Sequence, residues 1–434
     1  MKQPNVYDVI GIGIGPFNLG FAALAHDLPL TTLFLDQRPY FNWHPGLMIE
    51  HTTLQVPFLA DLVSVADICS RFSFLHYLQK NNKLFRFCIK ETFYITRKEY
   101  NDYCKWVVAQ LPECLFSHRV ESITYNKING YYEMRVHDMI GQYIKTYFTR
   151  KIVVGTGASP KIPDCAVETS RERVFHSAEY LYRKKYITPN STISVIGSGQ
   201  SAAEIFYDLL QEMDEKQFKL NWFTSSERFY PMENSKLTFE YTSPDYLSYF
   251  YKLPQQKKDS VLARQYMLYK GINQELIDAI YDALHHKIIQ NGVSPAATIQ
   301  ANSKLCSIDG NRKNGFNLGL HHTELEQAFN CPTDFLILAT GYQYTMPSFL
   351  VGIKDRIRWT PDGRADVGEN YAIDSQGDEL FVLNTSVHSH GFLSPDLGMG
   401  PYRNASIINY ILGKEHFRLD KKIAFQEFGI PVVA

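Results

Sequence analysis

Two glycine-rich turns, one near the start of the chain and one in its middle, constrain the fold more than any other feature. They read VIGIGIGPFNLG and ISVIGSGQSAAE, and each links a β-branched run to an apolar helical pattern, as in a dinucleotide-binding turn. In such a turn the N–H groups of a helix N-terminus stabilise a pyrophosphate. Two turns predict two dinucleotides, and flavin with nicotinamide is the usual pair. The expected cofactor-binding residues there are Gly11, Gly13, Gly15, Pro16, Gly197, Gly199, Gln200 and Ser201.

The residues after the next strand in each unit suggest which dinucleotide is bound. Asp36 ends the run 31–35, about 20 residues beyond the first glycines, where an acid can accept hydrogen bonds from both ribose hydroxyls of FAD. In the second unit the run 219–223 is followed by three hydroxyl residues, 224–226, and by Arg228. Hydroxyl groups and a guanidinium suit a ribose 2′-phosphate, so the sequence favours NADPH over NADH.

The order of these units predicts an α/β fold with two Rossmann-like dinucleotide-binding domains and an inserted, mostly helical substrate lobe. The run DFLILATGY is expected to bring the chain back onto the FAD domain, with Thr340 and Gly341 at the cofactor. The aromatic residues crowded between positions 239 and 251 either form a small core of the lobe or wall a substrate pocket. The expected ranges are 1–165 and 335–434 for the FAD domain, 166–235 and 292–334 for the NADPH domain, and 236–291 for the lobe.

Composition argues against several classes of partner. The 434 residues carry a net charge of -1, so no basic field indicates nucleic acid, and no run approaches the ~20 apolar residues of a membrane span. The 7 cysteines form no C-x-x-C pair, which argues against a disulfide reductase and for reduced thiols. His388 and His390 lack further ligands at metal spacing, so we expect no metal. We expect a cytoplasmic homo-oligomer without nucleic-acid or membrane partners.

An ordered set of motifs between residues 6 and 412 resembles the microbial N-hydroxylating flavoprotein monooxygenases. These are the lysine and ornithine N-hydroxylases of hydroxamate siderophore pathways, and the lysine type is more similar. The resemblance implies non-covalent FAD, NADPH as hydride donor and O₂ as co-substrate, with a primary amine oxidised to a hydroxylamine through a 4a-hydroperoxyflavin. Baeyer–Villiger and sulfur-oxidising flavin monooxygenases share this chemistry but lack two of the runs, FNWHPG and LQVPFLADLV. The motifs are GxGxGPFNL, FxWHxG, LQxxFLxDLVS, RxExxxYxxW, GxGxSA and ATGY.

The resemblance also implies roles for residues near the flavin. Gln55 corresponds to a glutamine beside the flavin ring, and Trp43 and His44 belong to the loop that lines it. Gln55 and His44 are therefore the expected catalytic residues, although His44 as a hydrogen-bonded structural residue stays an alternative. Leu397 is expected at the flavin, in a loop that reads Leu-Gly where the lysine and ornithine enzymes have Leu-Ser.

Two departures from the family concern the substrate. Amino-acid-hydroxylating members read LKDLV, where the lysine is understood to bind the substrate carboxylate, and this chain has Ala60 in its place. Ornithine enzymes carry a substrate-binding asparagine where this chain has Phe239. The sequence therefore predicts an amine without an α-carboxylate, such as histamine, putrescine or cadaverine. The expected substrate residues are Ala60, Phe239, Glu240, Tyr241 and Leu268.

The other charged residues near these positions leave two possibilities open. Glu240 or Asp245 is expected to bind a charge at the far end of the amine, next to aromatic side chains that can hold an ammonium by cation–π contact. Alternatively, a relocated cation binds a carboxylate, and the enzyme is then a lysine N-hydroxylase. The candidates for that cation are Lys236, Arg264 and Lys270.

Overall fold

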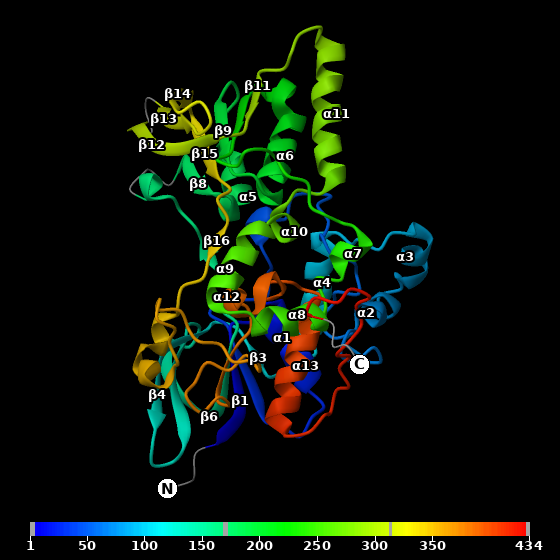
Figure 1. Cartoon of the computed structure of the whole chain (residues 1–434), viewed down its shortest axis with the longest axis vertical. Helices are drawn as coiled ribbons and strands as arrows, with labels where there is room; N and C mark the ends of the chain where they lie inside the picture. The colour runs from blue at the N-terminus through cyan, green and yellow to red at the C-terminus, as the bar shows by residue number, and fades with distance from the viewer. Residues whose placement is uncertain (1–4, 168–171, 312–314, 431–434) are drawn as a thin grey trace.

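The computed structural model describes residues 5–167, 172–311 and 315–430, which form two α/β domains at opposite ends of the molecule (Figure 1). A group of short helices lies between them. The predicted fold class, two Rossmann-like domains with a mostly helical insertion, is confirmed.

The first domain is built on a sheet whose parallel strands have the order β3-β2-β1-β6, with β17 also parallel to β6. The antiparallel strands β5 and β4 continue it beyond β6. Side chains alternate along β1, so Val9 packs on the face that α1 covers, and Ile10 and Ile12 pack on the other face. The strands are β1 (Val6–Ile12), β2 (Thr32–Leu35), β3 (Cys114–Leu115), β4 (His118–Asn126), β5 (Tyr131–Asp138), β6 (Tyr143–Val154) and β17 (Leu380–Val382). The helices are α1 (Pro16–Ala25), α2 (Phe74–Lys80), α3 (Leu84–Lys90), α4 (Arg97–Val108), α12 (Val387–His390) and α13 (Met399–Leu412).

The second domain contains a parallel sheet of order β11-β10-β9-β15-β8, with α6 connecting β9 to β10. An antiparallel sheet of β12, β13 and β14 lies beside it. The strands are β8 (Val174–His176), β9 (Thr192–Ile196), β10 (Lys219–Phe223), β11 (Ala297–Gln300), β12 (Ser303–Asn311), β13 (Gly315–His322), β14 (Gln327–Thr333) and β15 (Phe335–Leu338). The helices are α5 (Tyr180–Arg183), α6 (Gln200–Lys216) and α11 (Gln274–Asn291).

One strand lies in a different domain from the one predicted. The strand β15 was expected in the FAD domain, but it pairs with β9 and β8 of the second sheet. All of its side chains are buried, and a fully apolar run predicts burial without indicating in which sheet the strand lies. The chain returns after Leu338, where β16 (Tyr342–Gln343) pairs with β7 (Ser159–Pro160) of the outgoing crossing.

The region expected as a separate lobe is helical, but it shares its cores with both domains. Its long helix α11 packs against α6, with Ile280 in the core of the second domain. The shorter helices face the first domain, since Tyr246 and Phe250 of α8 form one cluster with Phe392 and Met399. Most of the aromatic crowding therefore builds a core across the domain boundary. The short helices are α7 (Lys236–Phe239), α8 (Pro244–Lys252), α9 (Gln255–Arg264) and α10 (Met267–Lys270).

A buried ion pair joins the two domains. The guanidinium of Arg97, on α4, donates two hydrogen bonds of 2.8 Å to the carboxylate of Glu204, on α6. Only 14% of the Arg97 side chain and 3% of the Glu204 side chain are exposed. Burial raises the pKa of Glu204, and the charge of Arg97 opposes that shift. Two-point pairing of this kind fixes orientation as well as distance.

We expect Glu204→Ala to lower the free energy of unfolding in urea by about 3–5 kcal/mol, because the Arg97 charge would stay buried without a partner. The matched control is Asp102→Ala. It removes the ion pair of Lys98 and Asp102, which is exposed and lies on α4, the helix that carries Arg97. That pair is worth less than about 1 kcal/mol. Equal losses in the two variants would contradict a special role for the interdomain pair.

Candidate active site

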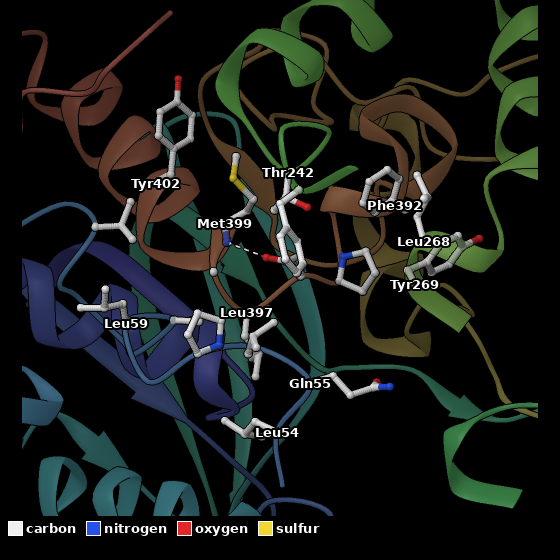
Figure 2. A pocket seen from close by; sticks show the side chains of 18 of the residues that line it. Leu54, Gln55, Leu59, Thr242, Leu268, Tyr269, Phe392, Leu397, Met399 and Tyr402 are labelled. Carbon is white, nitrogen blue, oxygen red and sulfur yellow. Dashed lines mark hydrogen bonds between the residues drawn. The ribbon is translucent and has the colours of Figure 1, made fainter. Parts of the chain in front are cut away.

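A cavity of about 710 Å³ lies between the first domain and the short helices that separate the two domains. Its walls come from the segment 53–60 of the first domain, from the helices α7 and α10, and from the loop that precedes α13 (Figure 2). Aliphatic and aromatic side chains dominate the labelled wall, including Leu54, Leu268, Tyr269 and Phe392. Six predicted site residues line it: Trp43, Gln55, Ala60, Phe239, Leu268 and Leu397.

The first glycine turn has the geometry of a pyrophosphate-binding turn. Gly13 has a φ of +86°, and a methyl group placed on it would lie 2.6 Å from the carbonyl oxygen of Gly155, so only glycine fits. A methyl group on Gly15 would meet no described atom within 4 Å. The space in front of the α1 N-terminus, where Pro16 is the first helical residue, is therefore open to a ligand. These residues fit the diphosphate of FAD.

Asp36 lies beside this turn, but its carboxylate already has protein partners. It accepts a 2.7 Å hydrogen bond from the backbone N–H of Ile14 and further bonds from the guanidinium of Arg38. Asp36 therefore holds the glycine turn against the end of β2. Its contact with a ribose stays a prediction.

The second turn is assembled in the same way. A methyl group on Gly197, whose φ is +144°, would collide with the carbonyl of Ala339. Gly199 caps α6, and Gln200 and Ser201 are its first residues. The hydroxyls of Ser226 and Ser198 are 3.1 Å apart, which brings the end of β10 next to the turn.

Two residues predicted to read the 2′-phosphate differ in access. Thr224 is buried, and its hydroxyl accepts a bond from the N–H of Ser226. Arg228 is exposed, with its guanidinium 4.4 Å from the centroid of the Tyr230 ring. Arg228 is thus free to approach a phosphate beside the turn, and its role stays a prediction.

Gln55 and Gln200 were predicted at different cofactors, and the structure brings them into contact. The amide nitrogen of Gln55 is 3.3 Å from the amide oxygen of Gln200 and 3.1 Å from that of Asn273. Gln200 in turn donates to Glu204, the partner of Arg97. One polar chain therefore runs from the interdomain ion pair to the cavity wall, and it orients the Gln55 side chain.

His44, Thr340 and Gly341 lie at the crossings between the domains. His44 is in the left-handed region with a φ of +46°, and its ring is 4.9 Å from that of Trp43 and 6.0 Å from that of Tyr342. The carbonyl of Gly341 accepts a bond from the backbone N–H of Lys161, across the paired crossings. Each of the three predicted cofactor contacts stays a prediction.

Glu240 and Asp245 bind the C-terminal segment of the chain. The carboxylate of Glu240 accepts hydrogen bonds of 2.9 and 3.0 Å from the backbone N–H groups of Phe425 and Gln426, which hold its pKa below the usual range. Asp245 accepts a 2.9 Å bond from the N–H of Ile423. Neither carboxylate is among the residues that line the cavity, and the contact of one of them with the far end of the amine stays a prediction.

Tyr241, another predicted substrate residue, also lies outside the cavity wall. Its ring packs at 4.8 Å from Tyr246 and at 5.1 Å from Phe428. Here it supports the C-terminal segment together with Glu240. The sequence analysis missed that this segment reaches the cavity, where its lining residues are Arg418, Leu419, Asp420 and Ile423.

The cavity wall offers no buried, unpaired cation, among its described lining residues, that could bind a substrate carboxylate. Among the described lining residues the two cations are Arg97, which Glu204 neutralises, and Arg418, which is exposed. The proposed replacements Lys236, Arg264 and Lys270 do not line the cavity. Sequence reasoning also missed Asp396, a lining carboxylate directly before Leu397; an acid next to that predicted flavin residue was the available signal.

The structure also bears on metals, thiols and membranes. Nowhere in the described ranges do three His, Cys, Asp or Glu residues gather as metal ligands. The ring of His388 is hydrogen-bonded to the carbonyl of Ala365, and the ring of His390 is hydrogen-bonded to the hydroxyl of Ser389. All 7 cysteines are free thiols. Within the part of the chain that is described, no helix has the length and apolar content to cross a membrane.

Comparison with known proteins agrees with this geometry. Residues 5–344 match the L-lysine 6-monooxygenase/L-ornithine 5-monooxygenase family. The chain is 45% identical to a putrescine N-hydroxylase of Shewanella oneidensis, over 98% of this chain and 84% of that protein. It is 30% identical to an L-lysine N6-monooxygenase of Escherichia coli, over 95% and 96% of the two chains.

A solved structure extends the similarity to the whole fold. It is an FAD-bound cadaverine monooxygenase of the desferrioxamine pathway from Erwinia amylovora, with a TM-score of 0.96 and 43% identity. The alignment covers 99% of this chain and 100% of that one. This chain therefore belongs to the lysine and ornithine monooxygenase family of N-hydroxylating flavoenzymes.

Proposed function

We propose that this protein is a cytoplasmic diamine N-hydroxylase of siderophore biosynthesis that uses FAD, NADPH and O₂. It converts one primary amine of putrescine or cadaverine, RNH₂, to RNHOH, while O₂ and NADPH with a proton yield water and NADP⁺. The relatives support this choice, because those named for putrescine and cadaverine are 45% and 43% identical, whereas the lysine enzyme is 30% identical.

The single observation that carries the proposal is the charge of the cavity wall. Ala60 is buried in this wall, where the resembling amino-acid hydroxylases have a lysine. An α-carboxylate beside Ala60 would lose its hydration without gaining a buried cation. Lysine and ornithine carry that group, and the diamines lack it. The exposed Arg418 is the remaining lining cation, and its charge is largely screened by water.

The residues of the chain bind, orient and shield the reactants. The first glycine turn holds FAD, which, when bound and reduced, supplies the activated oxygen for transfer to the amine. Gln55 and Trp43 face the cavity, where the isoalloxazine is expected by resemblance. The apolar wall excludes water and favours the neutral amine, which must be deprotonated to attack oxygen although its usual pKa is near 10.4.

A panel of amines tests the substrate. We expect kcat/KM for putrescine and cadaverine to exceed that for lysine and ornithine by about two to four orders of magnitude, since an unpaired buried charge costs roughly 3–5 kcal/mol. The measurement is hydroxylamine formation in the presence of NADPH. Equal efficiency on lysine would overturn the proposal and indicate a relocated cation.

Ala60→Lys tests the charge of the wall. We expect it to lower diamine turnover, because an ammonium would then lie in the wall beside a cationic substrate. Leu59→Lys is the matched control, since Leu59 lines the same cavity but is 44% exposed and a lysine there can reach water. A diamine activity that is the same in both variants would argue against Ala60 as the determinant.

Arg228→Ala tests the preference for NADPH. The loss of a charge-assisted phosphate contact should raise KM for NADPH about ten- to a hundred-fold and leave KM for NADH nearly unchanged. Lys185→Ala is the control, because Lys185 is also exposed and stacked on a tyrosine of this domain, but away from the turn. An equal rise in KM for NADPH and for NADH would show that Arg228 does not contact the 2′-phosphate.

Gly15→Val tests the flavin site. The φ of Gly15 is -91°, which a branched residue can adopt, so the fold should persist while the new side chain fills the space in front of α1. We expect a purified protein with little FAD, measured by flavin absorbance per chain. Gly429→Val, also at a glycine with open space around it, should keep its flavin.

A further inference from the structure

We propose that Asp396 recognises the second, unreacted ammonium group of the diamine. This inference rests on the proposed function, because it requires a substrate with an amine at each end. It assigns the specificity for a diamine over a monoamine to one carboxylate in the cavity wall.

Asp396 is a carboxylate that forms no ion pair with a described residue, although the buried Arg403 lies near enough for its charge to act on it. Its Oδ1 atom accepts a 3.0 Å hydrogen bond from the backbone N–H of Met399, the dashed line in Figure 2. Over the described ranges, no side chain donates to this carboxylate and no cation forms an ion pair with it. The nearby Arg403 donates to the carbonyl of Ser394. Burial raises the pKa of Asp396, and the N–H groups of Met399 and Gly398 and the charge of Arg403 oppose that shift.

Asp396 lies next to Ala60, the position at which the amino-acid hydroxylases carry a lysine. A methyl group placed on Gly398 would lie 3.1 Å from Oδ1 of Asp396 and 3.6 Å from Cβ of Ala60. The carboxylate and Ala60 therefore flank one point of the cavity. Where the amino-acid hydroxylases place a lysine, this wall carries a methyl group next to an acid. That arrangement repels a substrate carboxylate and attracts an ammonium.

The rest of the cavity suits the carbon chain of a diamine. In Figure 2, Leu397 lies between Gln55 and Met399, so apolar surface separates the expected flavin side from the Asp396 side. Leu268 and the stacked rings of Tyr269 and Phe392 add apolar wall. An extended aliphatic chain can thus place one amine near Gln55 and the other at Asp396.

The other acids near the cavity are less suited to this role. Glu233 and Asp420 line it but are exposed, so water screens their charges. Glu240 and Asp245 are occupied by the C-terminal segment. Asp396 is more enclosed than the two exposed acids, and a charge pair gains strength as the local dielectric falls.

The simplest alternative is that Asp396 only caps α13. Asparagine and serine cap helices about as well as aspartate, since each offers an oxygen to the same N–H group. Asp396→Asn therefore removes the charge and keeps the cap. Asp396→Ser does the same with a smaller side chain, and it replaces the first variant if that one folds poorly.

The experiment compares cadaverine with n-pentylamine, which has the same carbon chain and one amine. In the wild-type holoenzyme we expect kcat/KM to favour cadaverine about ten- to a hundred-fold, as for a hydrogen bond between charged groups. In Asp396→Asn, kcat/KM for cadaverine should fall by that factor, mainly through a higher KM. The kcat/KM for n-pentylamine should stay unchanged. Glu233→Gln and Asp420→Asn should each keep the wild-type preference.

The outcomes separate the two proposals. If the wild type hydroxylates neither amine, and no other diamine, the proposed function fails and this inference fails with it. If it hydroxylates both amines equally, or if Asp396→Asn and Asp396→Ser keep the preference for cadaverine, Asp396 is not the recognition residue and the function stands. Flavin content, melting temperature and n-pentylamine turnover distinguish a lost contact from a damaged fold. A loss on n-pentylamine equal to that on cadaverine would leave Asp396 a structural cap.

Discussion

The ion pair between Arg97 and Glu204 is the contact on which the geometry of the site depends. It is buried, joins the two domains, and continues through Gln200 to Gln55 and Asn273. The glycine turns can cooperate only if their relative position is held. The pair also neutralises Arg97, a lining cation that would otherwise offer a site to a substrate carboxylate. One interaction thus joins the two domains and neutralises a cation of the cavity wall.

The charges of the cavity wall are arranged for a cation. Ala60 and Gly398 leave an uncharged surface, Asp396 adds a negative charge beside it, and the remaining free cation, Arg418, lies in water. In a partly dry cavity the charge of the wall has a large effect on the binding free energy of a charged substrate. An unpaired charge is costly there, and a paired charge costs less. The proposed preference for a diamine over an amino acid therefore rests on the charge of a few residues of the wall.

The C-terminal segment forms part of this wall, and no local sequence pattern predicted that it would. It runs back beside α13 toward α7 and α8 (Figure 1), where Glu240 and Asp245 hold its backbone. The carboxylates of the helical region thereby act on the chain itself. The segment that they hold contributes Arg418, Leu419, Asp420 and Ile423 to the cavity wall.

The sequence by itself determined the two dinucleotide turns, the α/β class and the family, because glycine spacing and apolar runs are local signals. It also pointed to Gln55, Ala60, Phe239, Leu268 and Leu397, which all line one cavity. Only the tertiary structure decided that β15 belongs to the second sheet, that Glu240 and Asp245 bind the C-terminal segment, and that Asp396 lies beside Ala60. Those facts depend on which segments meet across long sequence separations, and the local pattern around a buried strand or an acidic residue is the same whichever partner it finds.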